Sequence, residues 1–379
     1  MPDFTSALYL GPRQLPPPPG LLLSPGRPAA LAEAGAARQV ANEVARRQGL
    51  AAGVLAPSTL HLFHDVFQLM PANGVLVLAR HLYPVGQWGS QQAQLRRLPV
   101  VRLGCPAELP ALLHTYRQQG RVPWLVADGW HPGLGPAPLA SYHAALAACP
   151  GAVLLLDDTQ AFGVLGARPT ATRPLGLGGG GSLRWAGLRD DGTGPELLTI
   201  TSLAKGLGVP VAVLAGRARR LAQFARCAET RVHSSPASIW HVWAAAQALR
   251  LDAHGGAAAR QQLGQRIGQF RAALGWVGLR PAGGWFPVQK LVPARATAAL
   301  ALHQQLRQAG IATVLLAGEQ QPGVPEIAFC LRADHSPADI ARVAAGLGYL
   351  ARRHADWFSC SSLPAACHAH SRLSICPAP

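Results

Sequence analysis

The sequence predicts an α/β fold in which helices sandwich a mostly parallel mixed sheet, followed by a smaller α+β domain. Two patterns predict it. Between residues 54 and 214, short apolar runs alternate with helical segments, as expected for strands buried on both faces. After residue 285, strand-like and helix-like segments alternate again in a compact stretch. A hydrophobic content of 49% is enough for a large core.

The expected elements follow one another along the chain. Residues 1–27 are rich in Pro and Gly and should form an extended arm. Helices are expected at residues 30–48, 60–70, 139–148, 238–271, 295–308 and 337–352. Strands are expected at residues 54–55, 74–78, 100–103, 124–127, 152–156, 197–200, 209–214, 285–292, 311–316 and 326–332.

Two segments break these patterns. Residues 167–196 contain Gly178 to Gly181 and should form a long loop, and residues 357–379 read as an untethered tail. We therefore expect four parts: an arm and a small-domain helix (1–45), a large cofactor-binding domain (46–255), a small α+β domain (256–355) and a disordered tail (356–379).

Charge and cysteine content limit the possible functions. The formal net charge is +16, but the arginines are scattered, so we expect no nucleic-acid partner. The seven cysteines lack the spacing of a disulfide framework or a metal site, which favours reduced thiols in the cytoplasm and no bound metal. The N-terminus lacks the pattern of a signal peptide, and no apolar run reaches membrane-spanning length.

Only two of the 34 basic residues are lysines, Lys205 and Lys290. A lysine amine can lose its proton and attack a carbonyl, whereas arginine stays protonated. Lys205 lies in the glycine-bearing stretch 202–208, directly after an apolar run, which suits a lysine that attacks an aldehyde. Lys290 is interpreted as an ordinary charge at a strand end.

Other polar residues follow predicted strands. Asp157 ends the run 153–156, and ligands of open α/β sheets bind at the carboxyl ends of strands. A buried carboxylate there can keep a pyridinium nitrogen protonated, although helix capping is an alternative role. Ser58 and Thr59 precede a helix and can bind phosphate or cap that helix, Ser202 can add a hydroxyl, and Tyr83 can stack on a flat cofactor.

With these residues in this order, residues 30–355 resemble the fold type I enzymes that depend on pyridoxal 5′-phosphate (PLP), and most closely the α-oxoamine synthases. The motifs that carry the resemblance are Asp157 to Gly166; Ser202, Lys205 and Gly208; Asp128-Gly129 with Ala137-Pro138-Leu139; Ser234-Ser235-Pro236; and Leu331 to Ile340.

The resemblance implies a role for each site residue. Lys205 would bind PLP covalently, Asp157 would pair with the ring nitrogen, and Gln160 would bond to the phenolic oxygen. Ser58, Thr59 and Ser202 would bind the phosphate, Tyr83 would stack on the ring, and Ser234 and Ser235 would reach the phosphate of a partner subunit. A homodimer would condense a small amino acid with an acyl-CoA or a carrier-bound acyl thioester, losing CO₂ to give an aminoketone.

The sequence also departs from the family pattern. Gln160 replaces a histidine, His131 lies where the match to a substrate-binding stretch is one residue short, and Ala328 replaces the arginine that grips the amino-acid carboxylate. Arg332 or Arg184 would then take over that contact.

These departures leave two alternatives open. One is a PLP-dependent aminotransferase or lyase of the same fold. The other is a non-catalytic, basic paralogue that binds nucleic acid, against which the Asp157 and Lys205 pair argues.

Overall fold

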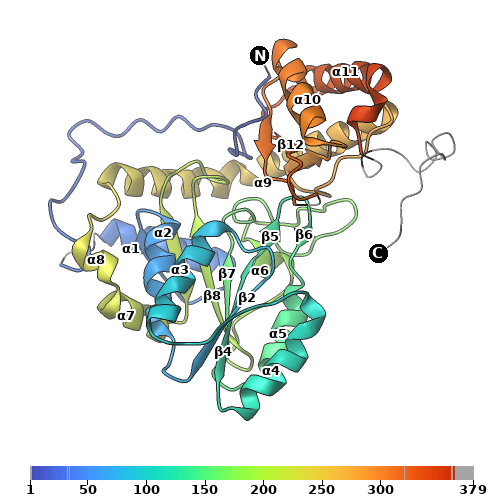
Figure 1. The fold of residues 1–379 in the computed structure, drawn as a ribbon. Helices are drawn as coiled ribbons and strands as arrows, with labels where there is room; N and C mark the ends of the chain where they lie inside the picture. The colour runs from blue at the N-terminus through green and yellow to red at the C-terminus, as the bar shows by residue number, and fades with distance from the viewer. Residues whose placement is uncertain (1, 32, 34, 320, 360–361, 363–379) are drawn as a thin grey trace. The chain divides into compact units, whose positions relative to one another are not determined.

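The computed structural model of the protein describes residues 2–31, 33, 35–319, 321–359 and 362. The chain forms two compact units (Figure 1). The larger unit contains residues 12–131 and 136–258. The smaller unit contains residues 2–11 and 132–135 and the described residues from 259 onwards.

The larger unit is built on a seven-stranded mixed sheet. Its strands are β1 (Ala52–Ala56), β2 (Gly74–Leu78), β3 (Val100–Arg102), β4 (Val122–Asp128), β7 (Val153–Asp157), β8 (Glu196–Ser202) and β9 (Ala212–Gly216). Their order is β1-β9-β8-β7-β4-β2-β3. From β8 to β3 all neighbours are parallel, while β9 is antiparallel to both β8 and β1. The predicted mostly parallel sheet is confirmed.

Helices cover both faces of this sheet. One face packs against α1 (Gly35–Gln48), α4 (Leu109–Gln118), α5 (Leu139–Ala147), α6 (Ser182–Trp185) and the start of α9 (Ile239–Trp276). The other face packs against α2 (Thr59–Val66), α3 (Pro84–Leu95) and α7 (Ala218–Cys227). The remaining short elements are α8 (Glu229–His233), β5 (Trp130–His131), β6 (Gly135–Pro136) and the 3₁₀ turns at Phe67–Leu69, Pro106–Glu108 and Ala355–Trp357.

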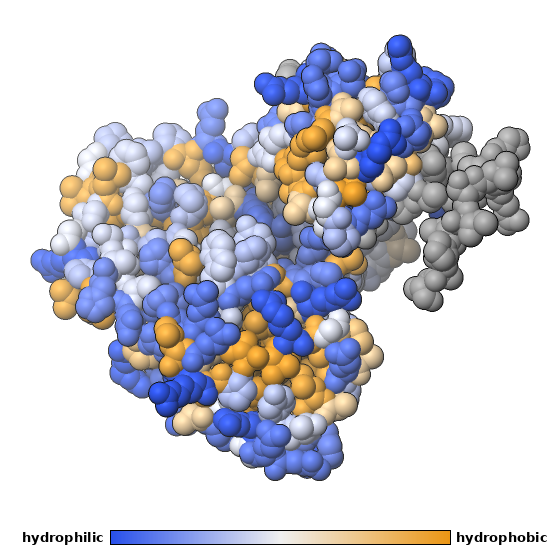
Figure 2. Space-filling model, in the orientation of Figure 1, coloured by the Kyte–Doolittle hydropathy of each residue, from blue (hydrophilic) through white to orange (hydrophobic). Residues whose placement is uncertain are grey.

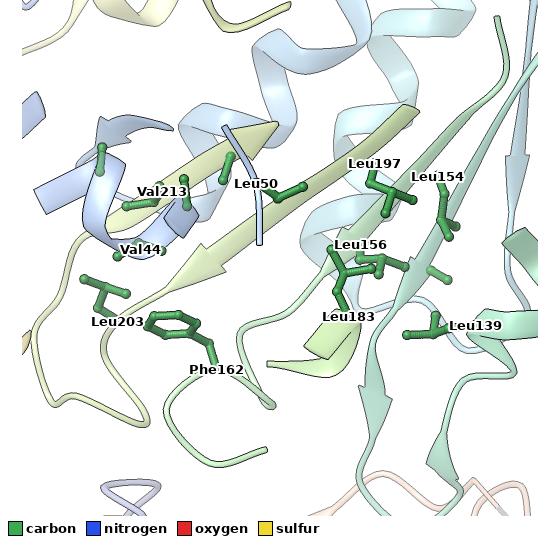
Figure 3. Close-up of a cluster of buried hydrophobic side chains, with 14 of the residues drawn as sticks. Val44, Leu50, Leu139, Leu154, Leu156, Phe162, Leu183, Leu197, Leu203 and Val213 are labelled. Carbon is green, nitrogen blue, oxygen red and sulfur yellow. The ribbon is translucent and has the colours of Figure 1, made fainter. Parts of the chain in front are cut away.

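Successive strand residues point to opposite faces, so each strand supplies both halves of the core. On β7, Leu154 and Leu156 join the cluster drawn in Figure 3, whereas Val153 and Leu155 join the other cluster. Figure 3 also places Phe162 and Leu203 in this core, from the loop after β7 and the turn after β8. The segments that follow both strands are thereby fixed by apolar packing.

The first helix lies in the larger unit and not in the smaller domain, where the sequence analysis placed it. Val40, Ala41 and Val44 of α1 are buried against the sheet, together with Leu55 of β1 and Val213 of β9. An apolar stripe at helical spacing packs wherever a complementary face is offered, and nothing in the spacing itself selects one domain.

The smaller unit has the predicted α+β content. Its strands β10 (Val288–Leu291), β11 (Val314–Leu316) and β12 (Glu326–Cys330) form an antiparallel sheet in the order β10-β12-β11. Helices α10 (Ala296–Gln308) and α11 (Pro337–Arg353) follow β10 and β12, and a capping box between Ser336 and Asp339 begins α11.

The first residues of the chain complete this smaller unit. The Phe4 N–H donates to the Ala312 carbonyl at 3.0 Å, and the Phe4 carbonyl accepts from the Cys330 N–H at 2.8 Å. The Phe4 side chain is fully buried and lies 4.3 Å from the His335 ring, centroid to centroid. The predicted extended arm therefore has a packed segment at its start.

The interpretation of Lys290 as an ordinary strand-end charge is wrong. Lys290 lies on β10, is 2% exposed, and forms ion pairs with Glu319 at 3.0 Å and Glu326 at 3.1 Å. A Cβ added to Gly133 would lie 3.0 Å from the Lys290 Nζ, so the backbone closely covers the amine. Its carboxylate partners lie outside β10, where the sequence pattern of that strand does not reveal them.

Three further expectations concern loops and solvent. The expected loop 167–196 contains one short helix, α6, and the predicted tail lies largely outside the described residues. Hydrophilic side chains cover much of the face shown in Figure 2, with apolar areas between them. None of the helices in the described ranges combines the length and apolarity that crossing a membrane requires.

Candidate active site

Several strands of the large sheet end at one edge. β1 and β8 run in the same direction, because both are antiparallel to β9. Ala56 at the end of β1 and Ser202 at the end of β8 both pair with Ala212. Ser58, just after β1, and Lys205, just after β8, therefore lie at the same edge of the sheet.

The parallel strands bring carboxylates to this edge. Asp157 ends β7 and pairs in register with Ile200 of β8 and with Asp128 of β4. The two Asp128 carboxylate oxygens each accept a hydrogen bond from the Tyr83 N–H at 3.2 Å. Asp128 thus holds the start of α3, where Tyr83 lies, beside the end of β7.

Asp157 is a buried carboxylate with nearby donors. Its side chain is 7% exposed, and its Oδ1 accepts from the Thr159 N–H at 3.0 Å. Burial raises the pKa of Asp157, while hydrogen bonds from Thr159 and the charge of Lys205 lower this pKa. A buried carboxylate near a cation suits a partner for a protonated ring nitrogen.

Lys205 lies in the turn that follows β8, and its Nζ is 5.9 Å from the centre of the Tyr83 ring. The Tyr83 side chain is 55% exposed. The Lys205 turn packs closely on the segment after β7, since a Cβ added to Gly206 would lie 2.3 Å from the Phe162 carbonyl oxygen. Two glycine-containing segments therefore set the position of the amine relative to Asp157.

The N-terminus of α2 supplies donors at the same edge. Ser58 occupies the N-cap position in an extended conformation, with no side-chain cap bond in the described structure. Its Oγ instead lies 2.8 Å from the His61 Nδ1. The first N–H groups of a helix bind anions well, and those of α2 begin at Thr59, directly after Ser58.

A second carboxylate, Asp158, has a structural environment. It is fully buried and accepts hydrogen bonds from the Ser182 N–H at 3.0 Å, from the Ser182 hydroxyl and from the Gln48 Nε2 at 3.1 Å. Burial raises the pKa of Asp158 to about 6 despite these donors. Asp158 joins the end of α1 to the start of α6.

Sequence reasoning missed two residues around these carboxylates. Gln48 is 1% exposed and also bonds to the hydroxyls of Thr199 and Thr201. The Thr159 Oγ1 accepts from the Ser202 N–H at 3.0 Å. The only sequence signal for Thr159 was its place directly after the two aspartates.

The other predicted site residues are distributed as follows. Gln160 is half-buried directly after Thr159, and the His131 ring lies 5.4 Å from the His81 ring. The Ser234 hydroxyl donates to the Thr230 carbonyl at 2.6 Å at the end of α8, and Ser235 is exposed. Asp65 holds this helix, accepting from the Thr230 N–H at 3.0 Å.

The two candidate replacements for the missing arginine differ. Arg332 belongs to the smaller unit, where its guanidinium binds Asp334 at 2.9 Å and lies 3.5 Å from Asp3. Arg184 lies on α6, and its guanidinium packs against Gly49 just after α1. Ala328 is buried on β12, where its register partner on β10 is Lys290.

An open α/β sheet with this strand-end arrangement defines the fold of the fold type I transferases. The chain belongs to the aminotransferase class I and II family, whose model matches residues 67–347.

Comparison with individual curated proteins shows which members of this family the chain is similar to. The chain is 30% identical over 231 residues to an 8-amino-7-oxononanoate synthase of Alkalilimnicola ehrlichii, covering 60% of this chain and 55% of the relative. It is 35% identical over 211 residues to the Klebsiella pneumoniae protein of the same name, covering 55% and 50%. The chain thus spans about half the length of the curated relatives it matches.

Solved structures show the same fold. A serine palmitoyltransferase of Sphingomonas wittichii matches with a TM-score of 0.75 and 15% identity, covering 88% of this chain and 81% of that chain. The 8-amino-7-oxononanoate synthase of Francisella tularensis matches with a TM-score of 0.70 and 16% identity, covering 93% and 98%.

Proposed function

We propose that this chain is a PLP-dependent acyltransferase of the oxoamine synthase kind, which joins a small amino acid to an acyl thioester. The observation that carries the proposal is the placement of Lys205, Asp157 and Tyr83 at one sheet edge. The similarity to 8-amino-7-oxononanoate synthases supports the reaction. The similarity to a solved structure of SPT (serine palmitoyltransferase) that contains PLP supports the cofactor.

The residues present fit PLP. A buried carboxylate, an amine, an exposed ring and a helix N-terminus match the ring nitrogen, aldehyde, ring face and phosphate of this cofactor. When bound, PLP supplies an electron-withdrawing ring that stabilises negative charge at the amino-acid Cα.

Each side chain then has a defined task. The Lys205 amine holds the cofactor and, once released from it, takes the proton from the amino-acid Cα. The Asp157 carboxylate retains the proton on the ring nitrogen. Ser58, Thr59 and Ser202 bind the phosphate, and Gln160 donates to the phenolic oxygen.

We further propose a cytoplasmic homodimer. Among the residues that the structure describes, Cys105, Cys149, Cys227 and Cys330 are free thiols, which supports a cytoplasmic location. In the larger unit, the side chains of Leu22, Leu23, Val232 and Trp240 are 40–68% exposed, and the Ile239 N–H bonds the Leu23 carbonyl at 2.9 Å. Exposed apolar side chains of this size favour burial against a second copy. Ser234 and Ser235 adjoin these residues in sequence and would approach the partner's phosphate.

For the amino-acid carboxylate, Arg184 is the better supported contact. Two acidic side chains already bind the Arg332 guanidinium, whereas Arg184 has no ion pair within the described residues. We propose that Arg184 and His131 bind substrate and that Arg332 stabilises the smaller unit.

Borohydride labelling tests the cofactor assignment. Purified protein should show visible absorbance with PLP, and reduction should attach the label to the peptide that contains Lys205. Lys290, the other lysine, is buried between two glutamates and serves as the internal control. Lys205→Arg, which keeps a positive charge, should carry no label. A label on Lys290, or none at all, would contradict the proposal.

Thiol release tests the reaction. The protein is incubated with small amino acids and acyl-CoA or carrier-bound thioesters, and free thiol is measured. Release that requires both substrates and Lys205 is expected. An aminotransferase is the second candidate, which Gln160 and Ala328 favour. That activity would instead give a keto acid from the amino acid without any thioester.

A further inference from the structure

We propose that Thr159 is a positioning residue that joins Asp157 and the Ser202 end of β8 into one hydrogen-bonded unit. The function proposed above gives Asp157 and Lys205 roles in the reaction but gives none to Thr159. The role for PLP that we assign to it rests on the proposed function.

Two hydrogen bonds define this unit. The Thr159 Oγ1 accepts from the Ser202 N–H at 3.0 Å. The Thr159 N–H donates to the Asp157 Oδ1 at 3.0 Å. The Thr159 side chain also lies near enough to the Asp157 carboxylate to lower its pKa. One residue therefore connects the ends of two neighbouring strands, β7 and β8.

The direction of these bonds follows from the chemistry of the groups. A hydroxyl has one proton to donate, and its oxygen can accept as well. An N–H can only donate, so Ser202 fixes the Thr159 oxygen as an acceptor and leaves its proton for Asp157. An ionised carboxylate can only accept, so this arrangement favours the anionic form of Asp157.

The charge state of Asp157 depends on a balance between burial, nearby charges and the hydrogen-bond donors of Thr159. The positive charge of Lys205 stabilises the ionised form of Asp157 and lowers its pKa, whereas burial in the sheet favours the protonated form and raises the pKa. Asp158, the next residue, and Asp128, the register partner on β4, are further carboxylates at this edge. Thr159 opposes burial with two neutral donors and so helps to retain the charge that a protonated ring nitrogen requires.

The same hydroxyl holds the segment that carries the lysine. Ser202 is the last residue of β8, and the Lys205 turn follows it. The Ser202 hydroxyl in turn accepts from the Ala204 N–H at 3.3 Å, within that turn. Loss of the Thr159 hydroxyl should therefore have two effects. It removes the acceptor of the Ser202 N–H before the Lys205 turn, and it removes a side chain that favours the ionised form of Asp157.

Thr159→Ala and Thr159→Ser separate this role from general packing. Both keep the N–H that bonds Asp157, but only serine keeps the hydroxyl. In PLP-loaded protein, we expect Thr159→Ala to raise the pH midpoint of the visible absorbance by about one unit. A less firmly protonated ring removes positive charge near the Lys205 nitrogen, which then holds its proton to higher pH. Thr159→Ser should restore the wild-type midpoint.

A second measurement needs no cofactor. Amide hydrogen exchange of cofactor-free protein, read on peptides spanning 197–207, should show faster exchange in Thr159→Ala and wild-type exchange in Thr159→Ser. Unchanged exchange in the alanine variant, or an unchanged absorbance midpoint, would overturn the role of Thr159. If wild-type protein takes up no PLP, the proposed function fails, while the exchange result still decides whether the hydroxyl holds β8.

Discussion

Replacement of Asp158 by asparagine should change how stability depends on pH. Asp158 is fully buried, and its folded-state pKa of about 6 lies above the ordinary value of 3.8. The folded protein therefore binds a proton more tightly than the unfolded chain does. The free energy of unfolding from this group is greatest below pH 3.8 and is lost as the pH rises through 6.

The size of the effect follows from the difference in pKa. A shift from 3.8 to about 6 corresponds to about 3 kcal/mol across the whole range, or about 1.4 kcal/mol between pH 5 and pH 7.5. Asparagine resembles the neutral acid and does not titrate. It can still accept from Ser182, and Gln48 can rotate its amide to offer an oxygen.

Urea denaturation of cofactor-free wild type and Asp158→Asn at about pH 5 and about pH 7.5 measures this effect. We expect the wild type to gain about 1.4 kcal/mol over the variant on moving to the lower pH. Asp191→Asn is the control. Asp191 is an exposed aspartate of the same unit, and hydrogen bonds from Thr193 lower its pKa. Parallel pH profiles for wild type and Asp158→Asn would refute the reasoning.

Two further substitutions test other contacts. Lys290→Met should lower the free energy of unfolding by about 3–5 kcal/mol, as measured by urea denaturation, because Glu326 would stay buried without its cation; an unchanged midpoint would contradict this. Gly206→Ala should reduce the PLP content of purified protein, measured spectroscopically, because the added Cβ meets the Phe162 carbonyl. Gly255→Ala, where nothing lies within 4 Å of the added carbon, should leave the PLP content unchanged.

Much of the fold was predictable because buried strands and amphipathic helices space their apolar residues differently along the sequence. The runs at 74–78 and 153–156 became β2 and most of β7, since fully buried strands must be apolar on both faces. The same logic placed Asp157 and Lys205 at one edge, because parallel strands end together. Asp157 and Lys205 lie at the same edge because β7 and β8 run parallel, and the alternation of strand-like and helix-like segments in the sequence predicts parallel strands.

The supporting residues were not predictable in this way. Gln48 and Thr159 act through partners that lie far along the chain or on a neighbouring strand, and single polar residues carry no periodic signal. Lys290 was misjudged for the same reason. Its partner Glu326 lies on β12, so only the pairing of strands shows that the amine is buried.

The pairing of Phe4 with residues 312 and 330 has a consequence during synthesis on the ribosome. A growing chain emerges from its N-terminal side, so Phe4 and Tyr9 leave the exit tunnel long before β12 exists. The rings of Phe4 and Tyr9 are almost fully buried in the folded protein. They must remain exposed to water, or bound to a chaperone, until residue 333 has been translated. The larger unit, which lies within residues 12–258, can fold in the meantime, and Phe4 can pair with β12 only after that strand has been made.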